Sequence, residues 1–199
     1  GNTVIDGTAP TAPAAPTQYL DNTDPVQGTF GTGTSTNDST PGLIIPAPAA
    51  GETPKLYVDG AAVAATYDAA TGTLTPTTAL SEGEHKLSYT LTDAAGNESD
   101  PSPALTLTVD TQAPDAPVVN PANTHDPITG TAEAGSTVSV SYPDGQGGTT
   151  TVTTTADADG HWSVPNPGLK DGDEVTATAT DAAGNVSQPG NTVIDGTAP

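Results

Sequence analysis

Residues 174–185 read EVTATATDAAGN, a run that alternates apolar with polar residues and then ends in a turn signal. Alternation with a period of two, rich in Val and Thr, is typical of a strand with one buried face. The closing DAAGN favours a tight hairpin turn, because Asp and Asn bond their own backbone and Gly allows a positive φ. We therefore expect a fold built from half-buried strands joined by tight turns.

The same alternation recurs along the chain, and turn signals separate the segments at intervals of about 8–12 residues. The alternating segments in the first half are 56–58, 85–92 and 104–109. In the second half we expect strands near 117–120, 126–132, 136–142, 149–155, 161–164, 174–180 and 190–195. No segment shows a helical period of useful length, so the sequence predicts an all-β fold of the sandwich type.

The chain also repeats itself. Residues 1–10 and residues 190–199 are both GNTVIDGTAP, and TDAAGN stands at 92–97 and again at 180–185. Self-similarity of this kind is the signature of a repeat architecture. We expect a piece of a longer array, made of the tail of a preceding repeat (1–10), a long repeat with an insertion (11–110) and a short repeat (111–199).

Composition limits the possible functions. The chain has 24 acidic and 3 basic residues, for a net charge of −21, so nucleic acid and anionic membranes are not expected partners. It has no cysteine and no apolar run near the roughly 20 residues that a spanning helix needs. Leu, Ile, Val and Phe make up 30 of 199 residues, a content low enough for disorder, but the regular patterning favours folding.

The core must be built from few large side chains. In the second repeat Val175, Ala177 and Ala179 share one face of a predicted strand, and two of them are small. A larger group has to fill that space, and Trp162 is the only tryptophan. We interpret Trp162 as a core residue, with a sugar-stacking platform as the alternative. In the first repeat the matching inward positions are Leu87, Tyr89 and Leu91.

Further motifs follow in a fixed order in the second repeat: DTQAPDAP at 110–117, GTAEAGSTV at 130–138, DADGHWSV at 157–164, LKDGD at 169–173 and DAAGN at 181–185. This series resembles the bacterial immunoglobulin-like repeats of giant surface adhesins of the biofilm-associated-protein (Bap) type. The first repeat resembles the long variant, but it departs from the pattern at 44–52, IIPAPAAGE. The resemblance implies two tandem immunoglobulin-like sandwiches arranged end to end, secreted, and often bound to calcium at repeat junctions.

Calcium is also the ion that the residues themselves favour, because hard cations take carboxylate and carbonyl oxygens. In an immunoglobulin-type sandwich the first strand starts at the end where the second and sixth turns lie. For the second repeat, that end gathers Asp110, Glu133, Asp181 and Asn185. The facing end of the first repeat presents Asp21, Asp24, Asp38, Glu82 and Glu84. The equivalent group in the first repeat is Asp6, Asp93 and Asn97, with Glu52 as a further candidate.

Several carboxylates at one junction repel one another unless a cation neutralises them, so we expect Ca²⁺ there. The alternative is that these residues only form turns. Asp157-Ala-Asp-Gly160 resembles the opening of an EF-hand loop, but position 12 would be Gly168, so we interpret it as a hairpin turn. No H-E-x-x-H, G-x-S-x-G or phosphate-cradling motif is present, and we expect no enzyme activity.

The sequence therefore predicts monomeric spacer repeats of an extracellular bacterial surface adhesin, supporting cell adhesion and biofilm formation and stiffened by Ca²⁺. The expected partners are neighbouring repeats and the same adhesin on other cells. Two alternatives remain open at this point. One is a module that binds a carbohydrate or a host protein, and the other is an accessory domain of a secreted polysaccharide-degrading enzyme.

Overall fold

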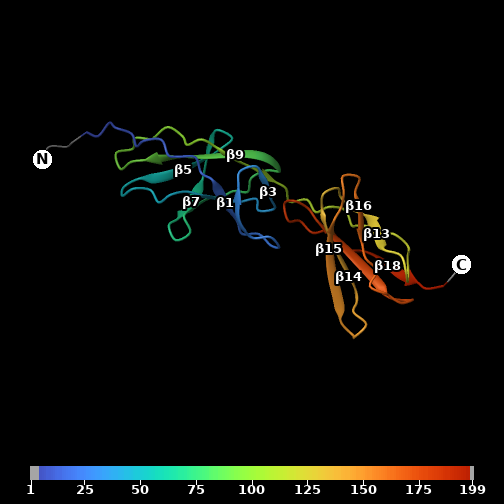
Figure 1. The fold of residues 1–199 in the computed structure, drawn as a ribbon. Helices are drawn as coiled ribbons and strands as arrows, with labels where there is room; N and C mark the ends of the chain where they lie inside the picture. The colour runs from blue at the N-terminus through green and yellow to red at the C-terminus, as the bar shows by residue number, and fades with distance from the viewer. Residues whose placement is uncertain (1–4, 198–199) are drawn as a thin grey trace. The chain divides into compact units, whose positions relative to one another are not determined.

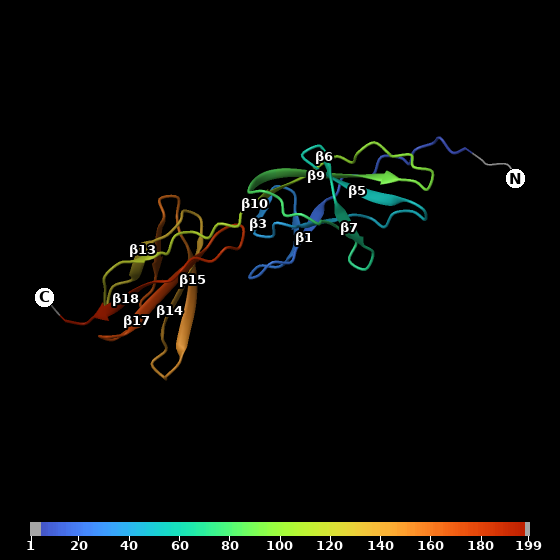
Figure 2. The ribbon, with the colours of Figure 1, turned by 180° about the vertical axis from the view of Figure 1, so that it is seen from behind.

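The computed structural model describes residues 5–197. Contacts divide the chain into two compact units, Gly1–Thr111 and Gln112–Pro199. The regular elements of the described residues are all strands (Figures 1 and 2). Each unit encloses its own apolar cluster. In this part of the chain no helix has the length and apolarity needed to cross a membrane. The expected all-β fold with two immunoglobulin-like sandwiches is confirmed.

Unit 1 contains two five-stranded sheets. The first has the order β2-β1-β4-β8-β7 and the second has the order β3-β10-β9-β5-β6. The strands of the first sheet are β1 (Gln18–Asp21), β2 (Gly28–Gly31), β4 (Gly42–Ile44), β7 (Ala65–Asp68) and β8 (Thr73–Pro76). Those of the second are β3 (Thr34–Thr36), β5 (Thr53–Val58), β6 (Ala61–Val63), β9 (Gly83–Thr92) and β10 (Leu105–Val109).

Unit 2 contains a three-stranded sheet, β11-β13-β16, and a five-stranded sheet, β12-β18-β17-β14-β15. The strands of the small sheet are β11 (Val118–Val119), β13 (Ile128–Thr131) and β16 (His161–Val164). Those of the large sheet are β12 (Ala122–Asn123), β14 (Thr137–Pro143), β15 (Thr149–Thr155), β17 (Glu174–Thr180) and β18 (Gly190–Asp195).

The first strand of unit 2 differs from the expected single segment. It is split into β11, which pairs with β13, and β12, which pairs with β18 in the other sheet. Pro121 stands between the two pieces. Proline has no N–H to donate to a ladder, so pairing stops there and the chain crosses from one sheet to the other.

The core of unit 2 confirms the interpretation of Trp162. This side chain is only 4% exposed and belongs to one cluster with Val175 and Ala177, both fully buried. The small Ala177 on β17 leaves room for the indole ring, and Gly130, the partner of Trp162 on the neighbouring strand β13, has no side chain to crowd it. In unit 1, Leu87 and Tyr89 are buried, and Leu91 packs partly buried at the border of the cluster.

In unit 1 the chain enters and leaves at opposite ends of the sandwich. At one end of β9, the Asn97 side-chain amide donates to the carbonyl oxygen of Asp6, 3.0 Å away. At the other end of β9, Gly83 pairs with Val109, the last residue of β10. Ten extended residues of β9 separate these points by about 30 Å.

Unit 2 follows the same route. Strand β12 is parallel to β18, and β18 is antiparallel to β17, so the first strand runs against β17. The chain therefore enters near Asp181, which follows the end of β17, and leaves near the start of β17, where Val193 pairs with Glu174. Each unit thus carries the chain from one end to the other.

The contact of Gly130 with Trp162 yields a stability prediction. A methyl group at Gly130 would overlap the Val118 carbonyl oxygen and the Trp162 ring. We expect Gly130→Ala to destabilise unit 2 by about 1–3 kcal/mol, the usual cost of overpacking a core. Urea unfolding followed by Trp162 fluorescence measures this, with Thr153→Ala on the exposed face of β15 as the control. An unchanged midpoint for Gly130→Ala would show that the packing is looser than described.

Candidate functional site

The DAAGN segment of unit 1 forms a five-residue loop around the Asp93 carboxylate. Asp93 Oδ1 accepts the backbone N–H groups of Ala95 and Asn97, each at 2.9 Å, and Oδ2 accepts the Asn97 side-chain amide at 2.9 Å. The Asp93 N–H donates to the carbonyl oxygen of Asn97, and Gly96 has φ +91°. Residues 94–96 therefore form a three-residue hairpin connection, and Gly96, the fourth residue of the five-residue loop, has a left-handed conformation.

Three loops of unit 2 have the same geometry. In each, Oδ1 of the first Asp accepts N–H groups from the third and fifth residues, and the fourth residue is a Gly with positive φ. These loops are 144–148, 157–161 and 181–185. Asp93 and Asp181, two of the predicted metal ligands, therefore accept hydrogen bonds that shape turns.

Hydrogen bonding makes three of these carboxylates more acidic. The Asn97 side-chain amide holds the pKa of Asp93 below its ordinary value. The N–H groups of Gln146 and Gly148 lower the pKa of Asp144, and the N–H of His161 lowers that of Asp157. Donors aimed at a carboxylate favour its charged form, so the loops are held best when these groups are ionised.

Two serines that the sequence analysis missed complete the DAAGN loops. Ser99 and Ser187 each stand two residues after the loop, are buried, and accept a backbone N–H from the preceding strand, from Leu91 and Ala179 respectively. Each hydroxyl then donates to the carbonyl oxygen of the next residue. The repeated spacing D-A-A-G-N-x-S was the available signal, and it defines one seven-residue unit in each domain.

Next to the first loop lies an acidic hollow at the end where the chain enters unit 1. It is lined by Asp6, Glu52 and Asp93, together with small residues of the turns at 50–51 and 94–95. Asn97 ties Asp6 to this loop. The structure thus brings together the predicted group of the first repeat, including Glu52, whose own carboxylate accepts the Ala49 N–H at 3.1 Å.

At the opposite end of unit 1, two predicted ligands are buried together. Asp21 and Asp38 are each 2% exposed, and Thr36 links them: its hydroxyl donates to Asp21 Oδ2 at 2.6 Å and accepts the Asp38 N–H at 3.0 Å. Asp24 is exposed nearby, where its carbonyl oxygen accepts the Asn37 amide. Asp21 also accepts the Thr23 N–H, and Asp38 accepts the N–H groups of Asn22 and Thr40, so both carboxylates shape this end of the unit.

The remaining predicted ligands lie further apart. Glu82 is exposed and accepts the N–H and hydroxyl of Thr111. Glu84 points to solvent from β9, opposite Thr108 of β10. Glu133 is exposed in the turn before β14. Asp110 donates its N–H to the Thr36 carbonyl oxygen, and the predicted calcium site between the repeats stays a prediction.

One group of side chains in the described residues meets the geometric requirement for a metal ion. Ligand atoms of Asp157, Asp159 and His161 lie within 4.8 Å of one another in the exposed turn between β15 and β16. The segment forms a turn as expected, but not a hairpin, because β15 and β16 belong to different sheets. The group could bind a metal ion. An imidazole with two carboxylates suits a transition metal better than calcium. The loop itself creates the group, because it brings its fifth residue back beside its first.

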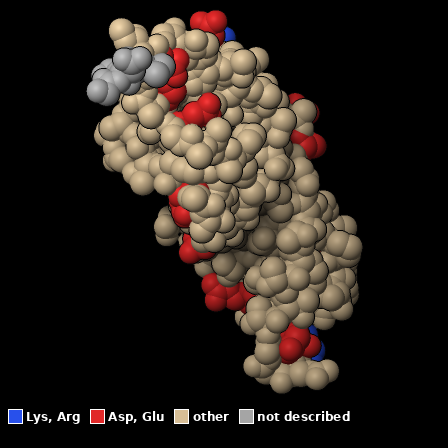
Figure 3. Space-filling view, turned by 90° about the vertical axis from the view of Figure 1, so that its left-hand side faces the viewer, with Lys and Arg blue, Asp and Glu red and all other residues tan. Residues whose placement is uncertain are grey.

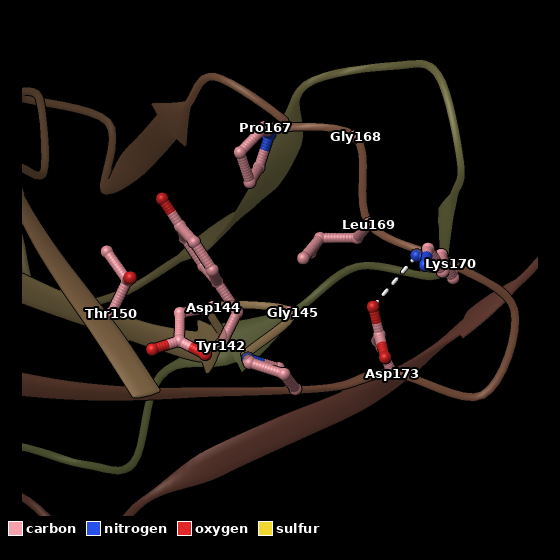
Figure 4. A pocket seen from close by; sticks show the side chains of 10 residues that line it. Tyr142, Asp144, Gly145, Thr150, Pro167, Gly168, Leu169, Lys170 and Asp173 are labelled. Atoms are coloured by element: carbon pink, nitrogen blue, oxygen red, sulfur yellow. Dashed lines mark hydrogen bonds between the residues drawn. The ribbon is translucent and has the colours of Figure 1, made fainter. Parts of the chain in front are cut away.

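Within residues 5–197, four aromatic side chains are buried, namely Tyr19, Tyr89, Tyr142 and Trp162, and the other three are partly exposed. Figure 4 shows the Tyr142 ring facing Leu169 across a small hollow, beside the Lys170 N–H that donates to Asp173. On the face drawn in Figure 3, acidic side chains form several separate patches and basic groups are few.

Comparison with known families identifies both units. The family described as bacterial Ig-like domain matches residues 14–111, and that described as bacterial Ig domain matches residues 113–195. The chain consists of two bacterial immunoglobulin-like domains in tandem. Such Ig-like domains are typical of surface and secreted bacterial proteins. No curated protein matches the sequence.

One solved structure shares the fold at a TM-score of 0.50, and two others align at lower scores. Fibronectin(III)-like modules of Clostridium thermocellum CbhA align with a TM-score of 0.50 at 14% identity, over 98% of this chain and 93% of theirs. A tetra-tandem repeat from the extending region of a large adhesion protein aligns at TM-score 0.37 and 24% identity, over 85% of this chain and 51% of that chain. The BSP domain of a biofilm-associated protein aligns at TM-score 0.34 and 23% identity, over 92% of this chain and 30% of that chain.

The buried serine of the second Ig-like domain can be tested directly. Ser187→Ala removes the acceptor of the Ala179 N–H and leaves this buried donor unsatisfied. We expect a loss of about 1–3 kcal/mol in the stability of unit 2. Urea unfolding monitored by Trp162 fluorescence provides the measurement, and Ser163→Ala, on the exposed face of β16, serves as the matched control. Equal midpoints for the two variants would contradict the assigned role.

The lowered pKa values of Asp144 and Asp157 predict that unit 2 loses stability in acid. A carboxyl whose pKa is lower in the folded state stabilises the fold above its unfolded pKa, about 3.9. This contribution disappears as the pH falls through the folded-state pKa. We expect the thermal unfolding midpoint, followed by Trp162 fluorescence, to decrease as the pH is lowered below about 4. In Asp157→Asn the decrease should be less steep. Parallel pH profiles for the two proteins would contradict this.

Proposed function

We propose that the two Ig-like domains are a structural spacer in an adhesin on the surface of a bacterium, with no catalytic role. The routing of the chain supports this proposal most directly. Each unit takes the chain in at one end and releases it at the other, so each unit adds its own length to an array. A domain whose ends lay side by side would add little.

Tension applied to the two ends of such a unit runs through packed strands. The last strand of each unit is an interior strand of its five-stranded sheet, paired on one side with β9 in unit 1 and with β17 in unit 2. On its other side it pairs in parallel with a short strand, β3 in unit 1 and β12 in unit 2. Extraction of the last strand therefore requires several ladder hydrogen bonds to break together.

Calcium binding at the acidic ends is the finer part of the proposal. A carboxylate has about four acceptor positions, and the N–H and amide donors described above use three of them on Asp93. Glu52 and Asp6 line the same hollow. This set fits a partly hydrated ion held by few protein oxygens, which corresponds to the weak affinity of extracellular modules.

The same proposal places the parent protein outside the cell, with neighbouring repeats as its direct partners. The acidic surface and the burial of the single tryptophan in a core favour a spacer over a carbohydrate-binding module. An accessory domain of a polysaccharide-degrading enzyme is the second candidate, and the repeated DAAGN-x-S unit favours an array over that role.

Pulling single molecules by their two ends tests the spacer function. We expect two separate unfolding events, each releasing roughly 250–350 Å of chain at about 3.5 Å per residue. Gly130→Ala should lower the force of the shorter event only, because the clash lies in unit 2. Smooth extension without two events would overturn a load-bearing role.

A calcium titration tests the finer part. Thermal unfolding is followed in EDTA and then in rising Ca²⁺, with Mg²⁺ as the control ion. If Kd lies near the 10⁻⁴–10⁻³ M of extracellular modules, saturation at 100 times Kd adds about 2.7 kcal/mol. Asp93→Asn keeps an acceptor for the loop but removes the charge, so it should reduce the calcium-specific rise. No shift at about 10 mM Ca²⁺ would remove calcium from the proposal and leave the spacer intact.

A further inference from the structure

Strand β15 is an unusual sheet edge. The four sheets end in eight edge strands among the described residues, and all of them except β15 have four residues or fewer. β15 has seven residues, Thr149–Thr155, with the sequence TTTVTTT. It pairs with β14 in unbroken register along its whole length. An exposed edge of this length presents a row of unpaired backbone groups to solvent.

The hydrogen-bond pattern shows which residues face the open edge. Asp144 donates its N–H to the Gly148 carbonyl oxygen, and Ala156 donates to that of Ser136, both at 3.0 Å. These bonds fix the alternation of the antiparallel ladder, so even-numbered residues of β15 bond to β14. The N–H and C=O groups of Thr149, Thr151, Thr153 and Thr155 therefore point away from β14.

The features that normally protect an edge are missing from β15. Proteins block such edges with lysine, proline, a bulge or an inward-pointing charge. β15 contains none of these residues, and its pairing with β14 shows no bulge. Thr and Val are also among the residues that favour extended strands most. In a chain of net charge −21, this stretch is neutral.

The sequence of β15 is a palindrome centred on Val152. In an antiparallel pair of two such strands related by a two-fold axis, Val152 lies opposite Val152 and every Thr lies opposite a Thr. We infer that β15 pairs with β15 of a second copy of this chain, joining the two large sheets into one continuous sheet. This inference goes beyond the spacer function and does not depend on it.

The palindrome agrees with the hydrogen-bond direction. With Val152 at the centre, Thr151 lies opposite Thr153 of the other copy and Thr149 lies opposite Thr155. All four are outward-facing residues, so these pairs would exchange about eight hydrogen bonds in total. The two Val152 residues form the central non-hydrogen-bonded pair, in which side chains approach most closely. The contact is isologous, and it closes with two copies.

Charge limits this contact to the neutral strand. Asp144 and Asp157 flank β15, and in this register they stand near the ends of the paired segment, where like charges of the two copies approach. A single pair of edges is small beside a standard interface, so it is weak. Several repeats in parallel arrays add such contacts, and their combined strength then rises steeply.

Disulfide trapping tests both the pairing and its register, because the chain has no cysteine of its own. Thr151→Cys and Thr153→Cys, both exposed, are mixed in equal amounts, one isotopically labelled, and mildly oxidised. The inferred register puts Cα atoms 151 and 153 of different copies about 5.5 Å apart, within reach of a disulfide. The residues at position 151 of the two copies are diagonal neighbours about 7–8 Å apart, which is too far for a disulfide. Mixed dimers should therefore clearly exceed the half share that random collision produces.

A proline variant separates pairing from collision. In this variant Thr151→Pro is added to the Thr153→Cys protein, which is again mixed with Thr151→Cys. The proline removes an N–H that faces the open edge and breaks no bond to β14, so mixed dimers should decrease about tenfold. Thr151→Val keeps the N–H and should leave them unchanged. An unaltered Trp162 unfolding midpoint shows that unit 2 remains folded. A random product ratio, an excess of like dimers, or mixed dimers that persist with proline would each overturn the inference.

Discussion

The fold depends on one repeated interaction, a carboxylate that accepts the N–H groups two and four residues ahead of it. It closes the loops that begin at Asp93, Asp144, Asp157 and Asp181. A chain with few large apolar residues gains little from its core to offset the entropy of ordering. Loops that hold their own shape reduce that demand. The acidic composition therefore reflects how the chain folds as well as how it presents itself to solvent.

The strands could be predicted from the sequence because each buries one face and leaves the other in water. The expected bounds 149–155, 161–164, 174–180 and 190–195 coincide with β15, β16, β17 and β18. Trp162 could be placed because small residues such as Ala177 on β17 need a large side chain to complete the core. The split of the first strand at Pro121 could not, since alternation does not say which of two sheets a short strand joins.

The expected sandwich topology correctly predicted that some acidic residues are neighbours, because turns at one end of a sandwich lie close together. It grouped Asp6 with Asp93, and Asp21 with Asp38. It could not show that hydroxyl and amide donors already occupy these carboxylates. The roles of Thr36, Ser99 and Ser187 depend on burial, and only the two serines had a signal in the sequence, their repeated place after DAAGN.

Turn-forming carboxylates and a neutral edge strand also have opposite effects on contacts between copies. Carboxylates that are satisfied by N–H donors keep their charge, so two chains of net charge −21 repel wherever their surfaces approach. β15 is the long edge without a charge, and only pairing in register keeps the flanking Asp144 and Asp157 at the margins. Repulsion over the rest of the surface then acts as selection for a single register. Dissolved ions would strengthen the contact by screening that repulsion, without entering a site.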